Sequence, residues 1–282
     1  MSLSRRAFLA SLAATAIPHV LHGTEDSRKL VMRIDMKGFG GAGEGDIKAV
    51  LRSAAGEIWR HCPNTHFEQP GFSIYHNDKF PITHFERSDD GWIVIGLAVE
   101  GNLWARFSYQ FAHEFCHALA DHANDWRRFW HNTGHSNKWL EEALCETASL
   151  FALRAMAKTW ETRPPYPNWK DYAKHLHDYA QERLDDPKHQ LPAGKSFIEW
   201  FRDNEPAMRK SGTIRESNTI VATQLLQLFE AEPRGWEAMT TLNLCKRIEN
   251  RPLADHLGEW KSNSRQELRP FVEKIAALFG VS

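Results

Sequence analysis

The sequence predicts an α+β fold, with a small N-terminal α/β portion that includes an edge strand, followed by a mainly helical portion. Short β-type runs bounded by turn residues occur only within the first hundred residues, whereas apolar residues recur at helical spacing from Leu103 onward. The 282-residue chain is also 42% hydrophobic and 11% aromatic, which is enough for a sizeable core. We therefore expect an α/β portion at residues 24–103 and a helical portion at 104–282, with no long linker between them.

The α/β portion is predicted to contain three strands and one helix. The first strand is the β-type run at residues 29–35, and a glycine-rich turn follows it. Residues 46–62 carry apolar side chains at helical spacing and are predicted to form a helix. Two further strands are predicted at residues 72–75 and 91–99, with an Asp-Asp-Gly turn before the second.

The remaining elements are all predicted to be helices, and many are separated by joints that contain proline or glycine. The predicted helices cover residues 104–123, 137–159, 170–183, 217–231, 252–261 and 265–279.

Residues 1–23 have the form of a bacterial export signal, because an arginine pair precedes a short, uncharged, alanine-rich stretch. Ser4-Arg-Arg-Ala-Phe-Leu9 resembles the twin-arginine signal, with Ala10 where lysine is common. The alternative is an amphipathic N-terminus without an export role. The stretch is too short to span a bilayer, and no later segment is long enough. We therefore expect a periplasmic or extracellular protein without stable membrane insertion.

The charge balance bears on the class of partner. Lys and Arg number 35 and Asp and Glu number 36, for a net charge of −1. Because nucleic-acid binders usually carry a basic excess, no nucleic-acid partner is expected. The four cysteines form no C-x-x-C pair. A bridge between Cys116 and Cys145 and buried free thiols both stay open.

The first helix of the helical portion contains the pattern His-Glu-x-x-His, at His113-Glu-Phe-Cys-His117. Residues i and i+4 lie on one helix face, so His113 and His117 can reach one ion from consecutive turns. Glu114 then falls to the side, where its carboxylate can act as general base on a water molecule at the ion. The pattern is typical of zinc hydrolases.

A catalytic zinc site needs a third protein ligand, and the next helix supplies candidates. Glu142 and Glu146 are again i and i+4, in an otherwise apolar run where carboxylates are costly unless they are paired or bind a metal. We expect Glu142 to bind the ion and Glu146 to receive the outer N–H of a ligating histidine. Glu141 lies about 100° away on the helix, where it is expected to be a solvated charge on the helix face and to tolerate replacement. The rival third ligands are Glu141, His122, His131 and His135.

At these residues the chain resembles the gluzincin metallopeptidases, which include thermolysin-like enzymes and aminopeptidases. Trp139-Leu-Glu-Glu-Ala143 is similar to their second motif, with Glu141 for the usual Asn and Ala143 for the usual Gly. The resemblance implies Zn²⁺ as cofactor, Glu142 as third ligand and a peptide or protein as substrate. It also places the strand within residues 92–99 as the substrate-lining edge strand. The family's oxyanion-stabilising Tyr or His is not located by the resemblance, and several candidates stay open: Tyr172, His175, His177, Tyr179, Arg209, Lys210 and Arg215.

We therefore expect a zinc-dependent metallopeptidase in which Glu114 is the general base. One alternative is a metallopeptidase-like binding protein that holds zinc but has weak or no catalytic activity. A second alternative is a helical domain in which the motif has arisen by chance. Metal content separates the last from the other two, and a peptidase assay separates those.

Overall fold

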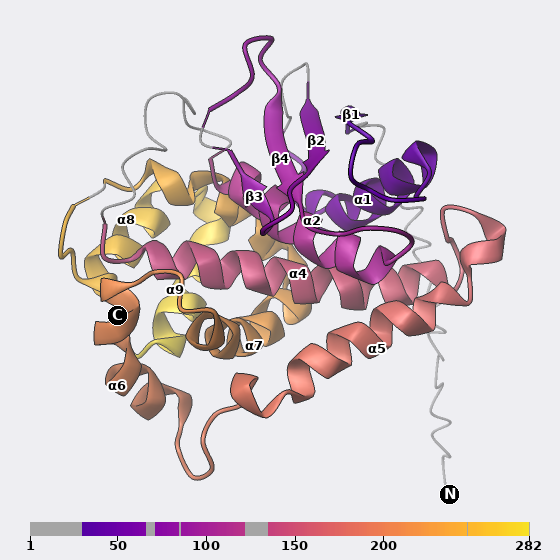
Figure 1. Ribbon diagram of the computed structural model, residues 1–282. Coiled ribbons are helices and arrows are strands. Elements are labelled where there is room, and N and C mark those ends of the chain that lie inside the picture. The colour runs from indigo at the N-terminus through magenta and orange to yellow at the C-terminus, as the bar shows by residue number, and fades with distance from the viewer. Residues whose placement is uncertain (1–29, 66–70, 85, 122–134, 247, 282) are drawn as a thin grey trace, which may run out of the picture.

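The computed structural model describes residues 30–65, 71–84, 86–121, 135–246 and 248–281. The predicted export signal and the candidate ligands His122 and His131 lie outside the described residues. Within them the predicted α+β class is confirmed, because a small sheet near the N-terminus is followed by a helical portion (Figure 1).

The sheet has four strands in the order β1 (Met32–Ile34), β2 (Phe72–His76), β4 (Ile93–Leu97) and β3 (Ile82–Thr83). The first three strands in this order run parallel, and β3 runs antiparallel to β4. The expectation that residues 92–99 form the edge strand is wrong, since β4 pairs with β2 on one side and β3 on the other. A two-residue strand gives no period-2 pattern, which is why the sequence does not reveal β3.

Two helices connect the sheet to the rest of the molecule. In α1 (Glu44–Trp59), apolar residues at helical spacing are buried, and the helix packs on α2 (Trp104–Ala120). Aromatic contacts join α2 to the sheet, because the Phe72 ring lies 6.3 Å from Phe111 and 5.8 Å from Phe115. The α/β portion and the helical portion therefore share one hydrophobic core.

The central helix of the molecule is α4 (Lys138–Trp160), which lies alongside α2 (Figure 1). Helices α1, α5 (Tyr172–Asp185) and α7 (Arg215–Ala231) also pack against it. Because neighbours surround it, α4 is buried over most of its circumference, and Trp139 and Trp160 are fully buried near its two ends. The acidic residues of this helix are consequently buried or half-buried.

Several elements complete the helical portion, and four of them lie outside the predicted helices. Two of these are the short 3-10 helices η1 (Pro167–Trp169) and η2 (Pro187–His189), and the longer two are α6 (Phe197–Lys210) and the 3-10 helix η3 (Pro233–Leu244). Pro206 and many polar residues obscure the pattern of α6, although Ser196 and Glu199 form a capping box at its start. The other elements are α8 (Leu253–Asn263), α9 (Arg269–Leu278) and the 3-10 helix η4 (Gln266–Leu268).

Two further sequence-level questions have answers in the structure. No helix among the described residues is long and apolar enough to cross a membrane. All four cysteines are buried free thiols, so Cys116 and Cys145 are not bridged.

Candidate metal centre

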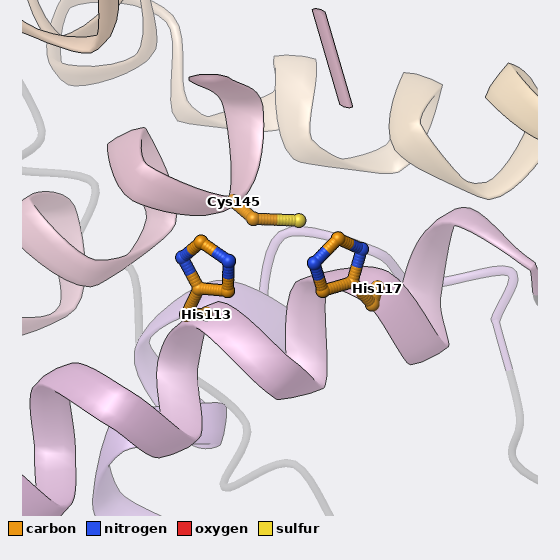
Figure 2. Close-up of side chains that lie close together, drawn as sticks. All are labelled: His113, His117 and Cys145. Atoms are coloured by element: carbon orange, nitrogen blue, oxygen red, sulfur yellow. The ribbon is translucent and has the colours of Figure 1, made fainter. Parts of the chain in front are cut away.

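Helices α2 and α4 bring three potential metal ligands together. His113 and His117 project from consecutive turns of α2, with ring centroids 5.0 Å apart. Cys145 approaches both rings from α4, as Figure 2 shows. One ligand atom from each of these residues lies within 4.8 Å of the others. The group is therefore close enough to hold a metal ion.

The predicted ligand Glu142 faces the same space. Its Oε2 atom lies 3.5 Å from His113 Nε2 and 3.8 Å from His117 Nε2. One carboxylate oxygen therefore faces the inner nitrogens of both histidines, as the expected i, i+4 geometry of the His-Glu-x-x-His helix requires.

The outer nitrogens of the histidines also face carboxylates. His113 Nδ1 lies 3.7 Å from Glu146 Oε2, the predicted outer partner, which is an ion-pair distance and longer than a hydrogen bond. His117 Nδ1 donates a hydrogen bond of 2.7 Å to Glu141 Oε1. The interpretation of Glu141 as a solvated charge on the helix face is wrong, because Glu141 is only 8% exposed and makes this contact with His117. Glu141 and Glu142 point in directions about 100° apart around α4. Because other helices surround α4, the Glu141 side chain points to the Nδ1 side of His117 and not to solvent.

These five residues, His113, His117, Glu141, Glu142 and Glu146, form what we call the histidine–carboxylate cluster. Burial lowers the pKa of His113, but the nearby carboxylates of Glu142 and Glu146 outweigh this effect and raise the pKa well above its usual value. Against the effect of burial, Glu141 and Glu142 likewise raise the pKa of His117 to about 9. Burial raises the pKa of Glu142, yet the histidines outweigh it and lower this pKa to about 2. Three carboxylates around two imidazoles therefore attract additional positive charge, which a metal ion or protons can supply.

The Glu146 side of the cluster contains a network that the sequence did not reveal. The Tyr109 hydroxyl donates to Glu146 Oε1, and Arg183 Nη2 donates to the Tyr109 oxygen at 3.2 Å. Arg183 Nη2 also lies 3.7 Å from Glu146 Oε1, and the Thr219 hydroxyl lies 3.2 Å from the same oxygen. One available signal was the position of Tyr109, which precedes His113 by one turn on the same face of α2. Nothing in the sequence indicated that Arg183 of α5 reaches this network.

The Glu141 side has a simpler arrangement. Asn243, from the unpredicted element η3, donates to Glu141 Oε2 at 3.2 Å. The remaining histidine candidate, His135, is not part of the group of potential metal ligands, and its ring stacks on His256 with centroids 5.7 Å apart.

The candidate base Glu114 is buried beside the edge strand. The Thr83 hydroxyl of β3 donates to Glu114 Oε2 at 2.8 Å and lies 3.0 Å from the Glu114 backbone oxygen. Glu114 is 4% exposed. The strand that contacts this residue is therefore β3 and not the one that the sequence suggested.

A cavity of about 300 Å³ lies against the cluster. Helix α2 contributes Tyr109, His113 and Glu114 to its wall, and α4 contributes Glu142 and Glu146. The turn before β3 and the start of α7 complete the wall, with Phe80, Pro81, Thr213, Arg215 and Asn218. The potential metal ligands, the candidate base and a space for a small ligand thus occur together.

Cys145 differs chemically from the other candidate ligands. Burial raises the pKa of its thiol well above the usual value, and the Cys116 thiol and the charges of Glu141 and Glu142 act in the same direction. A thiol must lose its proton before it binds a metal ion. The surroundings of Cys145 therefore disfavour the form that would act as ligand.

Comparisons with known proteins assign no family to this chain. No protein-family profile matches the chain, and no curated protein or solved structure shows significant similarity to it.

Proposed function

We propose that the protein is a zinc-dependent metallopeptidase with His113, His117 and Glu142 as metal ligands and Glu114 as general base. The observation that carries this proposal is the position of Glu142 Oε2, which faces the Nε2 atoms of both histidines. Carboxylates at the two outer Nδ1 atoms support it, because ligating histidines are commonly held in this way.

The donor set fits zinc. Two imidazoles and one carboxylate are ligands that zinc accepts in catalytic sites, where a fourth position stays open for water or substrate. Glu142 is the better third ligand than Cys145, since its Oε2 atom faces the Nε2 atoms of both histidines, whereas burial favours the protonated form of the Cys145 thiol. The adjoining cavity offers room for a peptide segment beside these residues.

The chain's own residues then account for the proton transfers of amide hydrolysis. Bound zinc would polarise the scissile carbonyl group and acidify a water molecule. The Glu114 carboxylate, which lines the cavity, accepts the water's proton and later donates it to the leaving amine nitrogen. The Thr83 hydroxyl donates to Glu114 Oε2 and so orients the carboxylate that carries the proton.

The same proposal includes export through the twin-arginine route to the periplasm or beyond, on the basis of Ser4-Arg-Arg-Ala-Phe-Leu9. Replacing both Arg5 and Arg6 by Lys is expected to retain the precursor in the cytoplasm, which fractionation and immunoblotting measure. Unchanged export of the double variant would contradict this route.

Replacing Glu114 with Gln tests the mechanism. Gln has nearly the same shape and can still accept the Thr83 hydrogen bond, so zinc content and thermal stability should match those of the parent. Peptidase activity should fall by about 10²–10⁴-fold or more, because the general base is lost. The matched control is Glu182→Gln, which makes the same chemical change at an exposed residue of α5.

Full activity of the Glu114→Gln variant would remove Glu114 from the mechanism. If the zinc-loaded parent cleaved no member of a mixed peptide library, the peptidase proposal would fail. The metallopeptidase-like binding protein would then be the better account.

A further inference from the structure

The start of α7 forms the wall of the cavity that faces Glu146. Thr219, in the second turn of this helix, places its hydroxyl 3.2 Å from Glu146 Oε1 and 2.9 Å from the backbone oxygen of Arg215. Asn218 Nδ2 donates to the Gly212 carbonyl at 2.8 Å and ties the helix to the loop before it. These contacts hold the first turns of α7 at a fixed position beside the cluster.

Arg215 is the first residue of α7 and lies on the same helix face as Thr219, because the two are i and i+4. Since Thr219 contacts Glu146, this face is directed at the cluster, and Arg215 indeed lines the cavity. Its charge reaches the cavity wall: burial and Glu146 raise the pKa of Tyr109, whereas Arg183 and Arg215 act to lower it.

The carboxylates of the cavity wall have polar partners, whereas its one arginine has no carboxylate partner among the described residues. The three carboxylates there already have partners, since Glu114 contacts Thr83, Glu142 faces the histidines and Glu146 accepts from Tyr109. Arg215 is the only lysine or arginine among the described residues that line the cavity. Within the described part of the chain, no carboxylate lies at ion-pairing distance from Arg215, and no side chain caps the start of α7.

We propose that Arg215 is a specificity-determining residue that binds a carboxylate of the peptide substrate, an inference that rests on the proposed peptidase function. A guanidinium group suits this task because its planar array of N–H donors matches a carboxylate with two parallel hydrogen bonds. The N-terminal end of α7 adds a favourable dipole for an anion at the same wall. Because the carboxylates of the cavity wall already have partners, Arg215 is the group that can distinguish an anionic peptide from a neutral one.

Two parts of a peptide can supply this carboxylate. One is the C-terminal carboxylate, which would make the protein an exopeptidase that removes C-terminal residues. The other is the side chain of Asp or Glu near the scissile bond. Four fluorescent peptides of one sequence separate these sources: a C-terminal acid or amide, each combined with Asp or Asn at the internal position.

Binding of these peptides to the zinc-loaded Glu114→Gln variant gives a readout that does not depend on turnover. We expect an added Arg215→Gln substitution to weaken binding of the preferred carboxylate peptide by about 10- to 100-fold, as for loss of a hydrogen bond to a charged group. Binding of the fully neutral peptide should stay within about twofold. The matched control is Lys188→Gln, which removes the same charge beside α7, where Lys188 lies 3.7 Å from Glu216 and outside the cavity wall.

Equal loss of binding for the carboxylate and neutral peptides would overturn the proposal, as would a loss in the Lys188→Gln variant as large as that in Arg215→Gln. Turnover of the same peptides by the parent separates this inference from the proposed function. Cleavage without any carboxylate preference refutes only the role of Arg215. Carboxylate-dependent binding without cleavage by the parent supports Arg215 and refutes the peptidase proposal.

Discussion

His113 and His117 lie one turn apart on α2, yet their outer surroundings differ. The His113 side has Glu146, whose carboxylate contacts Tyr109, Thr219 and Arg183 and borders the cavity. On the His117 side, Glu141 bonds only to His117 and Asn243 among the interactions described above. The side chain of His113 is 20% exposed and that of His117 is 10% exposed.

The difference shows how two histidines on one helix face can have unlike surroundings. The charge of Glu146 is offset by Arg183 as well as by His113, and its pKa is lowered to about 2 although burial raises it. Glu141 has a neutral amide in place of an arginine, so His117 provides the main compensation for its buried charge. The His113 side therefore borders the cavity, where we propose that the substrate binds, whereas the His117 side lies away from the cavity wall.

The largest expected effect on this comparison comes from replacing each carboxylate at an outer histidine nitrogen, Glu146 or Glu141, with Ala. Both Glu146→Ala and Glu141→Ala should weaken zinc binding by about 10- to 100-fold, because each removes the acceptor that orients a histidine. The Glu146 variant should be the weaker binder, since it also leaves the buried Tyr109 hydroxyl without its acceptor and Arg183 without its ion-pair partner. Competition with a chelating dye measures both affinities.

Glu182→Ala on the surface of α5 serves as the control for this pair. Parent-like zinc affinity in the Glu141→Ala variant would mean that the contact with His117 has no role in holding the metal.

A smaller effect is expected on the pH dependence of stability, through His256 of α8, which stacks on His135. Burial, together with the charges of His135 and Arg251, lowers the pKa of His256 from 6.5 to about 4. Because the folded-state pKa is depressed, the unfolded chain takes up a proton first as the pH falls below 6.5, and stability is lost down to about pH 4. Between pH 6.5 and 5.5 this residue should cost about 1 kcal/mol of unfolding free energy.

Urea unfolding of the zinc-free parent and of the His256→Gln variant measures this contribution as the difference between their unfolding free energies at each pH. The subtraction is needed because His117 contributes with the opposite sign: its raised pKa of about 9 gives stability that is present below pH 6.5 and lost toward pH 9. A pH-independent difference between parent and variant would contradict the assignment to His256.

The sequence predicted the parts of the molecule that depend on local spacing. The i, i+4 spacing of His113 and His117, and that of Glu142 and Glu146, places each pair on one helix face, and the structure brings the two pairs together. The partners Arg183 and Asn243 come from α5 and η3 through tertiary packing, for which a single sequence carries no periodic signal. Glu141 was misjudged for a related reason: its exposure depends on what surrounds α4 and not on its position along the helix.

The most direct test of the central claim, that His113, His117 and Glu142 hold zinc, is a parallel zinc titration of Glu142→Ala and Cys145→Ala. Both residues reach the histidine pair from α4, so the two variants compare a carboxylate with a thiol at one site. We predict that Glu142→Ala loses more than about 100-fold in zinc affinity, beyond the range for outer partners, and that Cys145→Ala stays near the parent. Parent-like affinity of Glu142→Ala, with loss of zinc in Cys145→Ala, would contradict this account and identify the thiolate as the third ligand.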